Sequence, residues 1–421
     1  YTSPLESISA DSQLALPEIA FQTEQQKHYE RLFFPYLNGH PTHVSRKAVD
    51  DAVEALVSDG TDVGEQLVEF VKSHGLDALV GQNTNAMPMT LLGGIGIHRV
   101  ATQYRVPTIF HHHDFWWERS RFSNARIEPL LNQIMPPSDL GLEHIVISSY
   151  AQHILTSLKR VQPHVVPNCE DFDNPVWVDE YNRDFRAELG FSERDLLIVQ
   201  PTRIVPRKRI EDSIRLLARL QGRFPDLRGR LQYIISLYQG DEPDNNYVAE
   251  IHGLAEQLEI PLHMISDRVA AVRGTDSHGR KLFTNRDVLA HADLVTYLPI
   301  WEGFGNALLE AVAAKVPVVT TTYLVYKTDI MPAGFLNIEI RDAYDKDGHL
   351  LIPDHVLDEI QHLLRNPEER QEIVEHNFRV GQREFGYDTL QQKLEAVMAH
   401  YGDEIRAGRR RIERVFARYS V

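Results

Sequence analysis

From residue 195 onward the chain alternates short apolar, β-prone runs with stretches of helical periodicity. The helical stretch after the first run repeats Ile210, Ile214, Leu217 and Leu220 at helix spacing. Parallel strands need a crossover between them, most often a helix, so this alternation predicts parallel βαβ units. We expect an α/β fold in this half, a doubly wound domain. Its predicted strands are residues 196–200, 231–237, 262–265, 294–300 and 316–320.

The first half carries fewer strand signals, at residues 78–81, 108–111 and 145–148, with helix-like sequence between them. Residues 1–45 contain no strand followed by a glycine-rich turn, which is how most such domains begin. Either this domain is unusual or its first strand and loop lie upstream of Tyr1, and we favour the second interpretation. Pro163, Pro167 and Asn168 interrupt the pattern, which predicts an N-terminal domain of residues 1–167 and a second domain of residues 168–386.

The C-terminal third is predicted to be helical, with a helix start at Asn366-Pro367, where Asn366 caps the helix. An interruption is expected near Gly386, followed by terminal helices over residues 387–421. Residues 406–418 carry six arginines and one acidic residue on a helical pattern. Such a helix is typical of a solvated or subunit-pairing surface, so a homodimer is one expectation, and contact with an anionic surface is the alternative.

Composition excludes several classes of protein. The 44 Lys and Arg residues against 60 Asp and Glu give a net charge of −16, which repels nucleic acids and anionic membranes. The one cysteine, Cys169, excludes an internal disulfide and any cysteine-based metal cluster, which favours a reducing compartment such as the cytoplasm. No apolar run approaches the roughly 20 residues of a membrane span, so none is predicted.

The segment with the most specific functional signal runs from Trp301 to Ala311, between a predicted strand and a predicted helix. Gly303 and Gly305 leave backbone N–H groups accessible where the helix begins. A helix N-terminus binds phosphate oxygens well, because its N–H groups and the helix dipole favour an anion. Glu302 and Glu310 are spaced to accept hydrogen bonds from two parts of one ligand. The alternative without a ligand is that Gly303 and Gly305 only form a tight turn and that Glu310 is a solvent-exposed acidic residue of the helix. The candidate ligand-binding residues are Glu302, Gly303, Phe304, Gly305, Asn306, Ala307 and Glu310.

A second segment, residues 201–209, places four cations directly after a strand: Arg203, Arg207, Lys208 and Arg209. In a chain of net charge −16 they form a local positive region where ligands of such sheets bind, so an anion is expected there. We expect Arg203 and Lys208 to meet the anion. For Arg207 and Arg209 we favour a solvated basic loop.

A third segment, His111-His112-His113-Asp114, ends another predicted strand. On an extended chain His111 and His113 share one face and His112 points to the other. With Asp114 they could bind a metal for hydrolysis, which is one alternative function. Trp117 close by could stack on a sugar ring, although aromatic residues after a strand are more often part of a core.

Together the three segments resemble the family 4 glycosyltransferases, retaining enzymes of the GT-B fold with two facing Rossmann-like domains. Glu302 through Glu310 resembles the E-x7-E signature of that family, and Arg203 with Lys208 resembles its Arg…Lys pair. His113 resembles the histidine at the end of a first-domain strand. The resemblance covers residues 78–385. The sequence around Phe110 and Tyr297 is similar to that of family members that make small glycosides of the mannosylglucosylglycerate type.

The resemblance implies a role for each matched residue. Arg203 and Lys208 would stabilise the departing diphosphate of a nucleotide-sugar donor. Glu302 would hold hydroxyls of the transferred hexose, and Glu310 would hold those of the nucleotide ribose. His113 would contact the sugar near the reacting carbon. No carboxylate nucleophile and no metal or other cofactor is implied, because the acceptor hydroxyl attacks the face that the diphosphate leaves.

The resemblance further implies that Asp114 contacts a small hydroxyl acceptor, that Asn168 opens the second domain, and that the terminal helices cross back onto the first domain. Two positions depart from the pattern: Arg209 and Lys315 stand where the family usually has glycine. We therefore predict a cytoplasmic retaining hexosyltransferase. A metal-dependent hydrolase and a nucleotide-sugar-binding protein without turnover are the alternatives.

Overall fold

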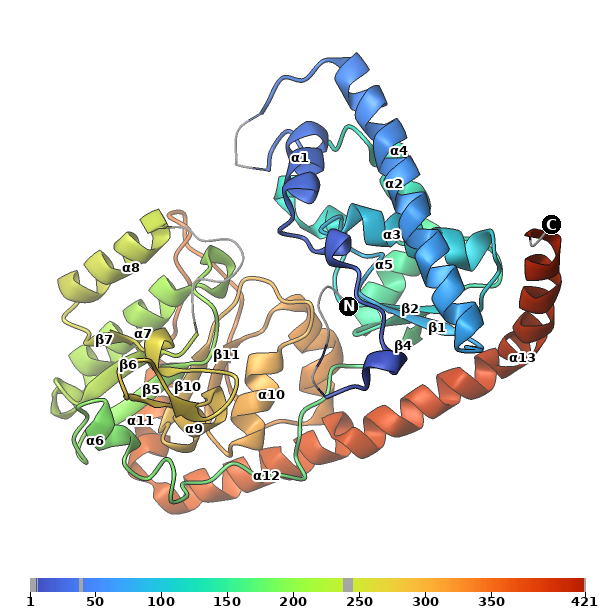
Figure 1. Ribbon diagram of the computed structural model, residues 1–421. Helices are drawn as coiled ribbons and strands as arrows, with labels where there is room; N and C mark the ends of the chain where they lie inside the picture. The colour runs from blue at the N-terminus through green and yellow to red at the C-terminus, as the bar shows by residue number, and fades with distance from the viewer. Residues whose placement is uncertain (1–4, 6, 38–40, 238–244, 420–421) are drawn as a thin grey trace. The chain divides into compact units, whose positions relative to one another are not determined.

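The computed structural model describes residues 5, 7–37, 41–237 and 245–419 (Figure 1). The chain forms two compact units. The first unit comprises Tyr1–Val166 together with Lys393–Val421, and the second comprises Pro167–Gln392. Pro167 and residues 387–392 thus belong to the second unit, whereas the sequence analysis placed Pro167 in the first domain and the six others with the terminal helices.

A parallel four-stranded sheet with the order β1-β2-β3-β4 forms the centre of the first unit. Its strands are β1 (Leu79–Gln82), β2 (Thr108–His112), β3 (Glu143–Val146) and β4 (His164–Val165). The helices that precede or connect them are α1 (Glu24–Phe33), α2 (Arg46–Ser73), α3 (Leu91–Thr102), α4 (Glu128–Ile134) and α5 (Ser149–Lys159). The three strands predicted here are confirmed. The two-residue strand β4 is too short to leave a sequence pattern.

Small residues let the long helix α2 pack closely against α3. A β-carbon on Gly60 of α2 would lie 2.7 Å from the Ile95 side chain, and one on Gly96 of α3 would lie 2.7 Å from that of Val63. Side chains at either glycine would force the helices apart, because packed interiors have no spare volume. This pair of helices forms much of the core of the first unit, with Leu56, Leu91 and Leu92 buried in it.

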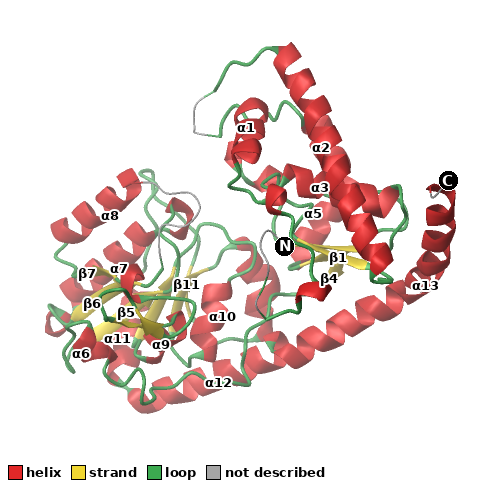
Figure 2. Cartoon of the chain, viewed as in Figure 1, coloured by secondary structure: helices red, strands yellow, loops and turns green. Residues whose placement is uncertain are grey.

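The second unit is built on a six-stranded parallel sheet with the order β12-β11-β10-β5-β6-β7 (Figure 2). Its strands are β5 (Leu196–Gln200), β6 (Leu231–Ile235), β7 (Leu262–Met264), β10 (Leu294–Tyr297), β11 (Val318–Thr321) and β12 (Ile338–Ile340). This is the strand order of the Rossmann fold, and it reverses between β5 and β10. Five strands are confirmed predictions; β12 was not predicted.

The remaining elements of this unit are shorter connections and covering helices. They are α6 (Phe185–Glu188), α7 (Ile210–Arg223), α8 (Asn245–Gln257), the hairpin of β8 (Gly274–Thr275) and β9 (Lys281–Leu282), α9 (Asn285–Ala290), α10 (Asn306–Ala313), α11 (Asp354–Arg365) and α12 (Pro367–Phe385). The apolar stripe of α7 explains why this helix forms: Ile210, Ile214, Leu217 and Leu220 are all fully buried against the sheet.

The last helix, α13 (Tyr387–Tyr419), follows α12 after a break at Gly386, as predicted. The prediction that the Asn366 side chain caps α12 is wrong, although the residue stands at the predicted position. Asn366 stands at the N-cap position of α12, but its side chain makes no capping bond and instead donates to the carbonyl of His362, 2.7 Å away. That carbonyl belongs to the last turn of α11, so Asn366 satisfies the end of one helix and not the start of the next.

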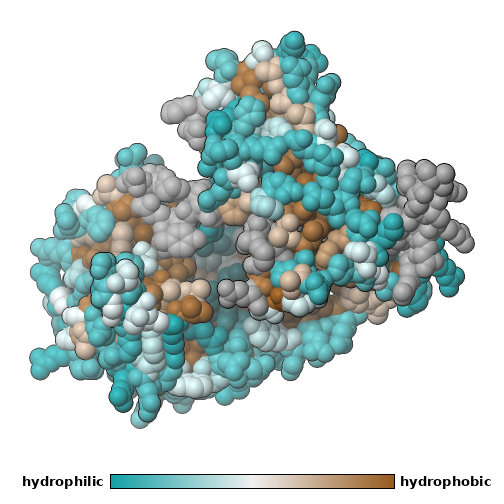
Figure 3. All heavy atoms as spheres, viewed as in Figure 1, coloured by the Kyte–Doolittle hydropathy of each residue, from teal (hydrophilic) through white to brown (hydrophobic). Residues whose placement is uncertain are grey.

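Hydrophilic side chains cover most of the face shown in Figure 3, with apolar side chains in scattered patches. Over the described ranges, no helix is both long and apolar enough to cross a bilayer.

Candidate active site

Two of the predicted motifs meet at the point where the strand order of the second unit reverses. The loop after β5 contains a short 3-10 turn, Pro206–Lys208, and the loop after β10 leads into α10. The backbone N–H of Ile300 donates to the carbonyl of Arg207 at 3.1 Å, which joins the two loops. Since β5 and β10 are parallel neighbours, both loops leave the same edge of the sheet. Ligands of open α/β sheets bind at this kind of edge.

The side chains of Lys208 and Glu302 form an ion pair across these loops. Arg207 donates a second charged hydrogen bond to the same carboxylate at 2.7 Å. The Lys208 ammonium also lies 5.3 Å from the centre of the Tyr297 ring. The two motifs that were predicted separately are therefore one cluster, in which an acidic side chain from one loop is held by two cations from the other.

The charge balance of this cluster is reflected in its pKa values. Burial alone raises the pKa of Glu302, but the charges of Lys208 and Arg207 outweigh burial, so the pKa lies below its usual value. Burial lowers the pKa of Lys208, and the positive charges of Arg207 and Arg203 add to that effect against the opposing pull of Glu302. The carboxylate is held ionised in an environment that has more positive than negative side chains.

The expectation that Arg207 and Arg209 form a solvated basic loop is wrong. Arg207 pairs with Glu302, and Arg209 pairs with the buried Asp212 at 2.7 Å and with Glu211 at 3.2 Å. Arg209 also has a left-handed backbone, with φ of 53°. Glycine adopts such a conformation without steric cost, which explains physically why glycine suits this position. Here the ion pairs hold an arginine in that conformation.

Glycine is required at the start of α10. Gly305 has φ of 143°, and a β-carbon there would lie 2.3 Å from the hydroxyl oxygen of Tyr323. That hydroxyl donates to the carbonyl of Phe304 at 2.6 Å, which fixes the turn just before the helix. Gly303 is half-buried in the same turn, and Ala307 is buried behind it. The first N–H groups of a helix have no intrahelical partners, so this turn presents donors to a ligand.

Two further predicted residues meet beside this turn. The amide of Asn168 donates to the side-chain oxygen of Asn306, the first residue of α10, at 2.7 Å. The segment that opens the second unit is thereby tied to the start of the helix. Both asparagines come from motifs that were identified independently in the sequence.

Glu310 is the fifth residue of α10, about one turn from its start, and its carboxylate accepts a hydrogen bond from the Asn285 amide at 2.7 Å. Burial and then the nearby charge of Glu170 raise the pKa of Glu310 to about 7. Its carboxyl therefore changes charge near neutral pH. Asn285, the first residue of α9, is itself fixed by a 2.7 Å hydrogen bond from Ser236.

The predicted first-unit residues form a second, separate cluster at the ends of β1 and β2. The backbone N–H of His113 donates to the side chain of Asn83 at 2.9 Å, and the His113 ring lies 2.6 Å from the amide nitrogen of Gln82. Asp114 accepts from Asn83 at 3.1 Å and from Arg119 at 2.7 Å. Burial lowers the pKa of His113, and Asp114 partly opposes this. A neutral ring at position 113 is the result.

The alternation expected for the three histidines is confirmed. The rings of His111 and His113 lie 4.7 Å apart, whereas His112 is buried on the other face, 3.1 Å from a ring nitrogen of His144. The Asp114 carboxylate accepts hydrogen bonds from Asn83 and Arg119. Among the described residues, His111, His113 and Asp114 do not form a metal-binding group, so nothing supports the hydrolase alternative.

Trp117 lies at the edge of the core of the first unit. Phe115 stacks on its ring at 4.7 Å, and Trp116 meets it edge-on at 5.7 Å. One ring face is thus used by the protein, which leaves at most the other face for a sugar. Trp116 is buried, with its indole N–H donating to the carbonyl of Met135.

Several residues of these clusters were not singled out from the sequence. Gln82 ends β1 and Asn83 follows it, so polar residues at the end of a predicted strand were the available signal. Gln200, the last residue of β5, donates to the carbonyl of Lys208 at 3.1 Å and accepts from Ser213 at 2.9 Å. It is fully buried and holds the Lys208 loop on the sheet. Asn285 had no recognisable sequence signal.

Comparisons with known proteins agree with the motifs. Residues 182–379 match the family described as glycosyl transferases group 1. The chain is 32% identical over 396 residues to mannosylglucosylglycerate synthase of Thermotoga maritima, covering 90% of this chain and 88% of that protein. It is 30% identical over 334 residues to the protein of the same name from Petrotoga mobilis, covering 76% of this chain and 74% of that protein.

Solved structures show the same fold at lower sequence identity. Sucrose-phosphate synthase of Thermosynechococcus elongatus superposes with a TM-score of 0.59 at 13% identity, covering 85% of this chain and 80% of that one. Such a likeness supports the fold and carries no argument on substrate. The extent of the match to the two synthases, together with the E-x7-E and Arg…Lys motifs, establishes that the chain belongs to the family 4, group 1 glycosyltransferases of the GT-B fold.

Proposed function

We propose that this glycosyltransferase moves a hexose from a nucleoside-diphosphate sugar to a hydroxyl of a small glycerate glycoside, with retention at the anomeric carbon. The observation that carries the proposal is the Lys208–Glu302 pair beside the start of α10, at the reversal point of the sheet. The names of the two relatives describe a product in which a mannosyl group is joined to glucosylglycerate. We infer a mannosyl donor and glucosylglycerate as acceptor.

The diphosphate is proposed to lie between the loop after β5 and the first turn of α10. Lys208, Arg207 and Arg203 place three cations near one carboxylate, so this corner attracts an anion. An ammonium has three N–H donors, and Glu302 uses one of those of Lys208, which leaves donors for phosphate oxygens. Negative charge grows on the diphosphate as it leaves, and donors fixed in advance stabilise that charge.

The proposed step breaks the bond between the anomeric carbon and the diphosphate oxygen. The acceptor oxygen forms its bond to the same carbon on the same face, and the acceptor proton passes to an oxygen of the departing diphosphate. Glu302 would hold hydroxyls of the transferred sugar, and Glu310 would accept from the ribose. His113 would contact the sugar through its neutral ring, and Asp114 and Trp117 would meet the acceptor.

We propose that no metal takes part in this step. The support is the charge of the site itself, since arginine, lysine and helix N–H groups supply the positive potential that a divalent ion supplies at other diphosphate sites. Activity retained after exhaustive chelation is the expected result.

The experiment is a donor panel with purified protein. UDP-, GDP- and ADP-hexoses are each incubated with glucosylglycerate, and products are identified by mass spectrometry and by the anomeric coupling in the NMR spectrum. One donor is expected to give a disaccharide glycerate whose new linkage keeps the donor configuration. Binding of a donor without consumption would favour the non-catalytic alternative, and an inverted linkage would contradict the proposed step. Thermal shift with UDP, GDP and ADP identifies the base independently, because a ligand that binds only the folded protein raises its melting temperature.

A further inference from the structure

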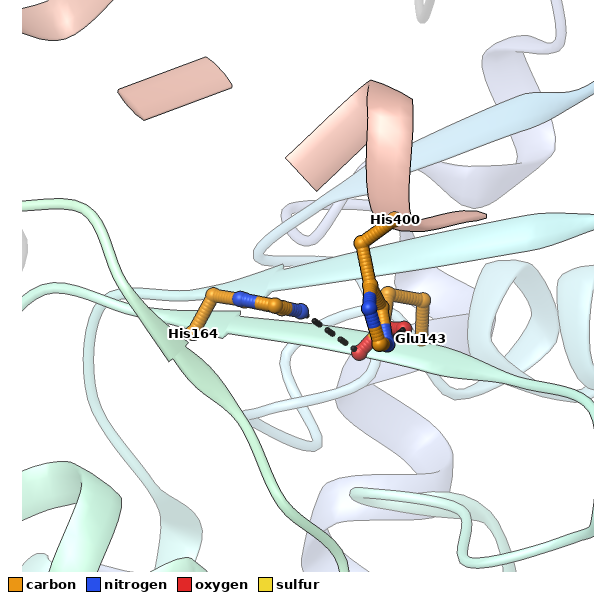
Figure 4. A group of neighbouring side chains, drawn as sticks. All are labelled: Glu143, His164 and His400. Atoms are coloured by element: carbon orange, nitrogen blue, oxygen red, sulfur yellow. Dashed lines mark ion pairs between the residues drawn. The ribbon is translucent and has the colours of Figure 1, made fainter. Parts of the chain in front are cut away.

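A cluster of two histidines and a glutamate joins three elements of the first unit, away from the predicted sugar-binding residues of that unit. Glu143 begins β3, His164 begins β4, and His400 lies on α13 (Figure 4). One ligand atom from each residue lies within 4.8 Å of the other two. Among the described residues this is the one group of three or more such side chains that converges in this way.

The distances in the cluster are longer than hydrogen bonds and leave room for an ion. Nε2 of His164 lies 3.5 Å from one carboxylate oxygen of Glu143, and Nε2 of His400 lies 3.6 Å from the other. Hydrogen bonds of this type are about 2.7–3.2 Å long. Metal bonds of about 2.0–2.2 Å in a tetrahedron place neighbouring ligand atoms about 3.4 Å apart. Both imidazole nitrogens are therefore farther from Glu143 than a hydrogen bond reaches, and one atom of each side chain lies within 4.8 Å of the other two, close enough for one ion to lie between them.

A second observation also points to a missing partner. Nε2 of His164 is buried, yet no hydrogen bond satisfies it. In Figure 4 this atom points at the Glu143 carboxylate, and the His400 ring reaches the same carboxylate from the helix. The backbone N–H of His144 donates to the Glu143 carboxylate at 3.1 Å, which fixes its orientation. A buried polar atom without a partner is costly, and a bound ion would remove that cost.

We propose that Glu143, His164 and His400 bind one divalent transition-metal ion, of which zinc is the best match. Two imidazoles and one carboxylate suit zinc, cobalt or nickel, whereas magnesium and calcium prefer sites built of oxygen ligands alone. The His400 side chain is 66% exposed, so water from that side would complete the coordination. The site is structural and separate from the sugar transfer.

The ion would fasten α13 to the sheet of the first unit. Tyr401, next to His400, already anchors this part of the helix: its hydroxyl donates to the carbonyl of Gly141 and accepts from the N–H of Thr108 at 3.2 Å. His400 is thereby held over the sheet before the ion binds. Only the folded unit brings the three ligands together, so binding must stabilise that fold.

The test uses the untagged full-length chain, because a histidine tag would bind the same ions. After chelation and dialysis, Co²⁺ and Zn²⁺ are titrated in turn, with the visible spectrum of Co²⁺ reporting coordination and thermal unfolding reporting stability. We expect one equivalent of ion, the intense Co²⁺ bands of a four-coordinate site, and a higher melting temperature. His400→Ala should weaken binding by at least about 10-fold, since even outer partners of a metal ligand contribute that much.

His153→Ala is the matched control, because His153 is an exposed histidine on α5 in the same unit. This variant should bind the ion as the wild type does. Unchanged melting of metal-free His400→Ala would show that the variant is folded, and Glu143→Gln provides a second ligand deletion. Equal affinity in the wild type and His400→Ala would overturn the proposal, as would a wild type that takes up no ion.

Discussion

The Lys208 ammonium and the Glu302 carboxylate form an ion pair with only 10% and 11% of their side chains exposed. The two residues come from loops after neighbouring strands, so the pair depends on the register of β5 against β10. A buried pair of this kind adds little net stability, but removal of one partner leaves an uncompensated charge. Its place at the proposed donor site agrees with a role in the chemistry.

Replacement of Lys208 by alanine is expected to lower kcat by about 10²–10³, the effect of losing one donor to a developing charge. The measurement is the steady-state rate with the donor identified from the panel. Lys327→Ala is the matched control, because Lys327 is a lysine of the same unit that pairs with Asp342 at 2.7 Å outside the proposed site. A Lys208→Ala enzyme as fast as the Lys327→Ala enzyme would remove Lys208 from the mechanism.

Donor affinity should depend on pH through Glu310. The pKa of its carboxyl is raised to about 7. In the proposed role, the ionised form is the one that accepts the ribose hydroxyls. Below pH 7 binding must first remove a proton, so the Kd of the intact nucleotide sugar should rise up to about 10-fold per pH unit. Calorimetry from pH 5.5 to 8.5 measures this. Glu310→Gln should bind weakly with a flatter profile; the same slope in both proteins would contradict the assignment.

The same group predicts a pH effect on stability. The folded protein holds the Glu310 proton up to about pH 7, whereas the unfolded chain releases it near the usual pKa of a glutamate, 4.5. The contribution of Glu310 to stability is therefore full at acid pH and is lost as the pH rises toward 7. Glu310→Gln should gain melting temperature relative to the wild type between pH 5 and pH 8. A difference that stays constant with pH would count against the raised pKa.

The start of α10 offers a double-mutant test. Gly305→Ala should destabilise the protein and weaken donor binding, because the new β-carbon collides with the Tyr323 hydroxyl and the backbone φ of 143° disfavours alanine. Tyr323→Phe removes the hydroxyl and its bond to Phe304. The double variant should recover part of the loss, since the collision is then absent. Strictly additive losses in chemical denaturation would show that the two residues are not coupled in this way.

Two non-glycine residues in the left-handed conformation should respond differently to glycine. Arg209 and Lys315 have φ of 53° and 55°. Glycine relieves about 1–2 kcal/mol of backbone strain but costs about 0.5–1 kcal/mol in chain entropy. Lys315 pairs with Glu375 through side chains that are each 33% exposed, an interaction worth at most about 1 kcal/mol, so Lys315→Gly should be near neutral.

Arg209→Gly should instead lower the free energy of unfolding by about 1–3 kcal/mol, because it takes a charged partner from the buried Asp212. Denaturant unfolding of the two variants side by side measures the contrast. Equal effects would mean that the ion pairs of Arg209 do not hold its backbone.

Much of the second unit could be predicted because buried parallel strands appear as continuous apolar runs and α7 repeats its apolar residues at helix spacing. The carboxyl ends of such strands meet at one edge, which is why residues from separate motifs could be expected to meet. The pairing of Lys208 with Glu302, and of Arg207 with the same carboxylate, could not be predicted, since it depends on side-chain directions and loop contacts. In the first unit, β4 has two residues and leaves no pattern. The Glu143, His164 and His400 cluster draws on distant parts of the chain that only the tertiary fold brings together.

The chain passes between the units twice, after Val166 and after Gln392, so the first unit includes residues on both sides of the second. During synthesis at about 5–20 residues per second, the nascent first unit lacks the helix that carries Tyr401 until the whole second unit has left the ribosome. Until then, the N–H of Thr108 and the carbonyl of Gly141 lack the Tyr401 hydroxyl, their hydrogen-bond partner in the folded protein. The unit whose synthesis begins before that of the second unit is thus completed after it.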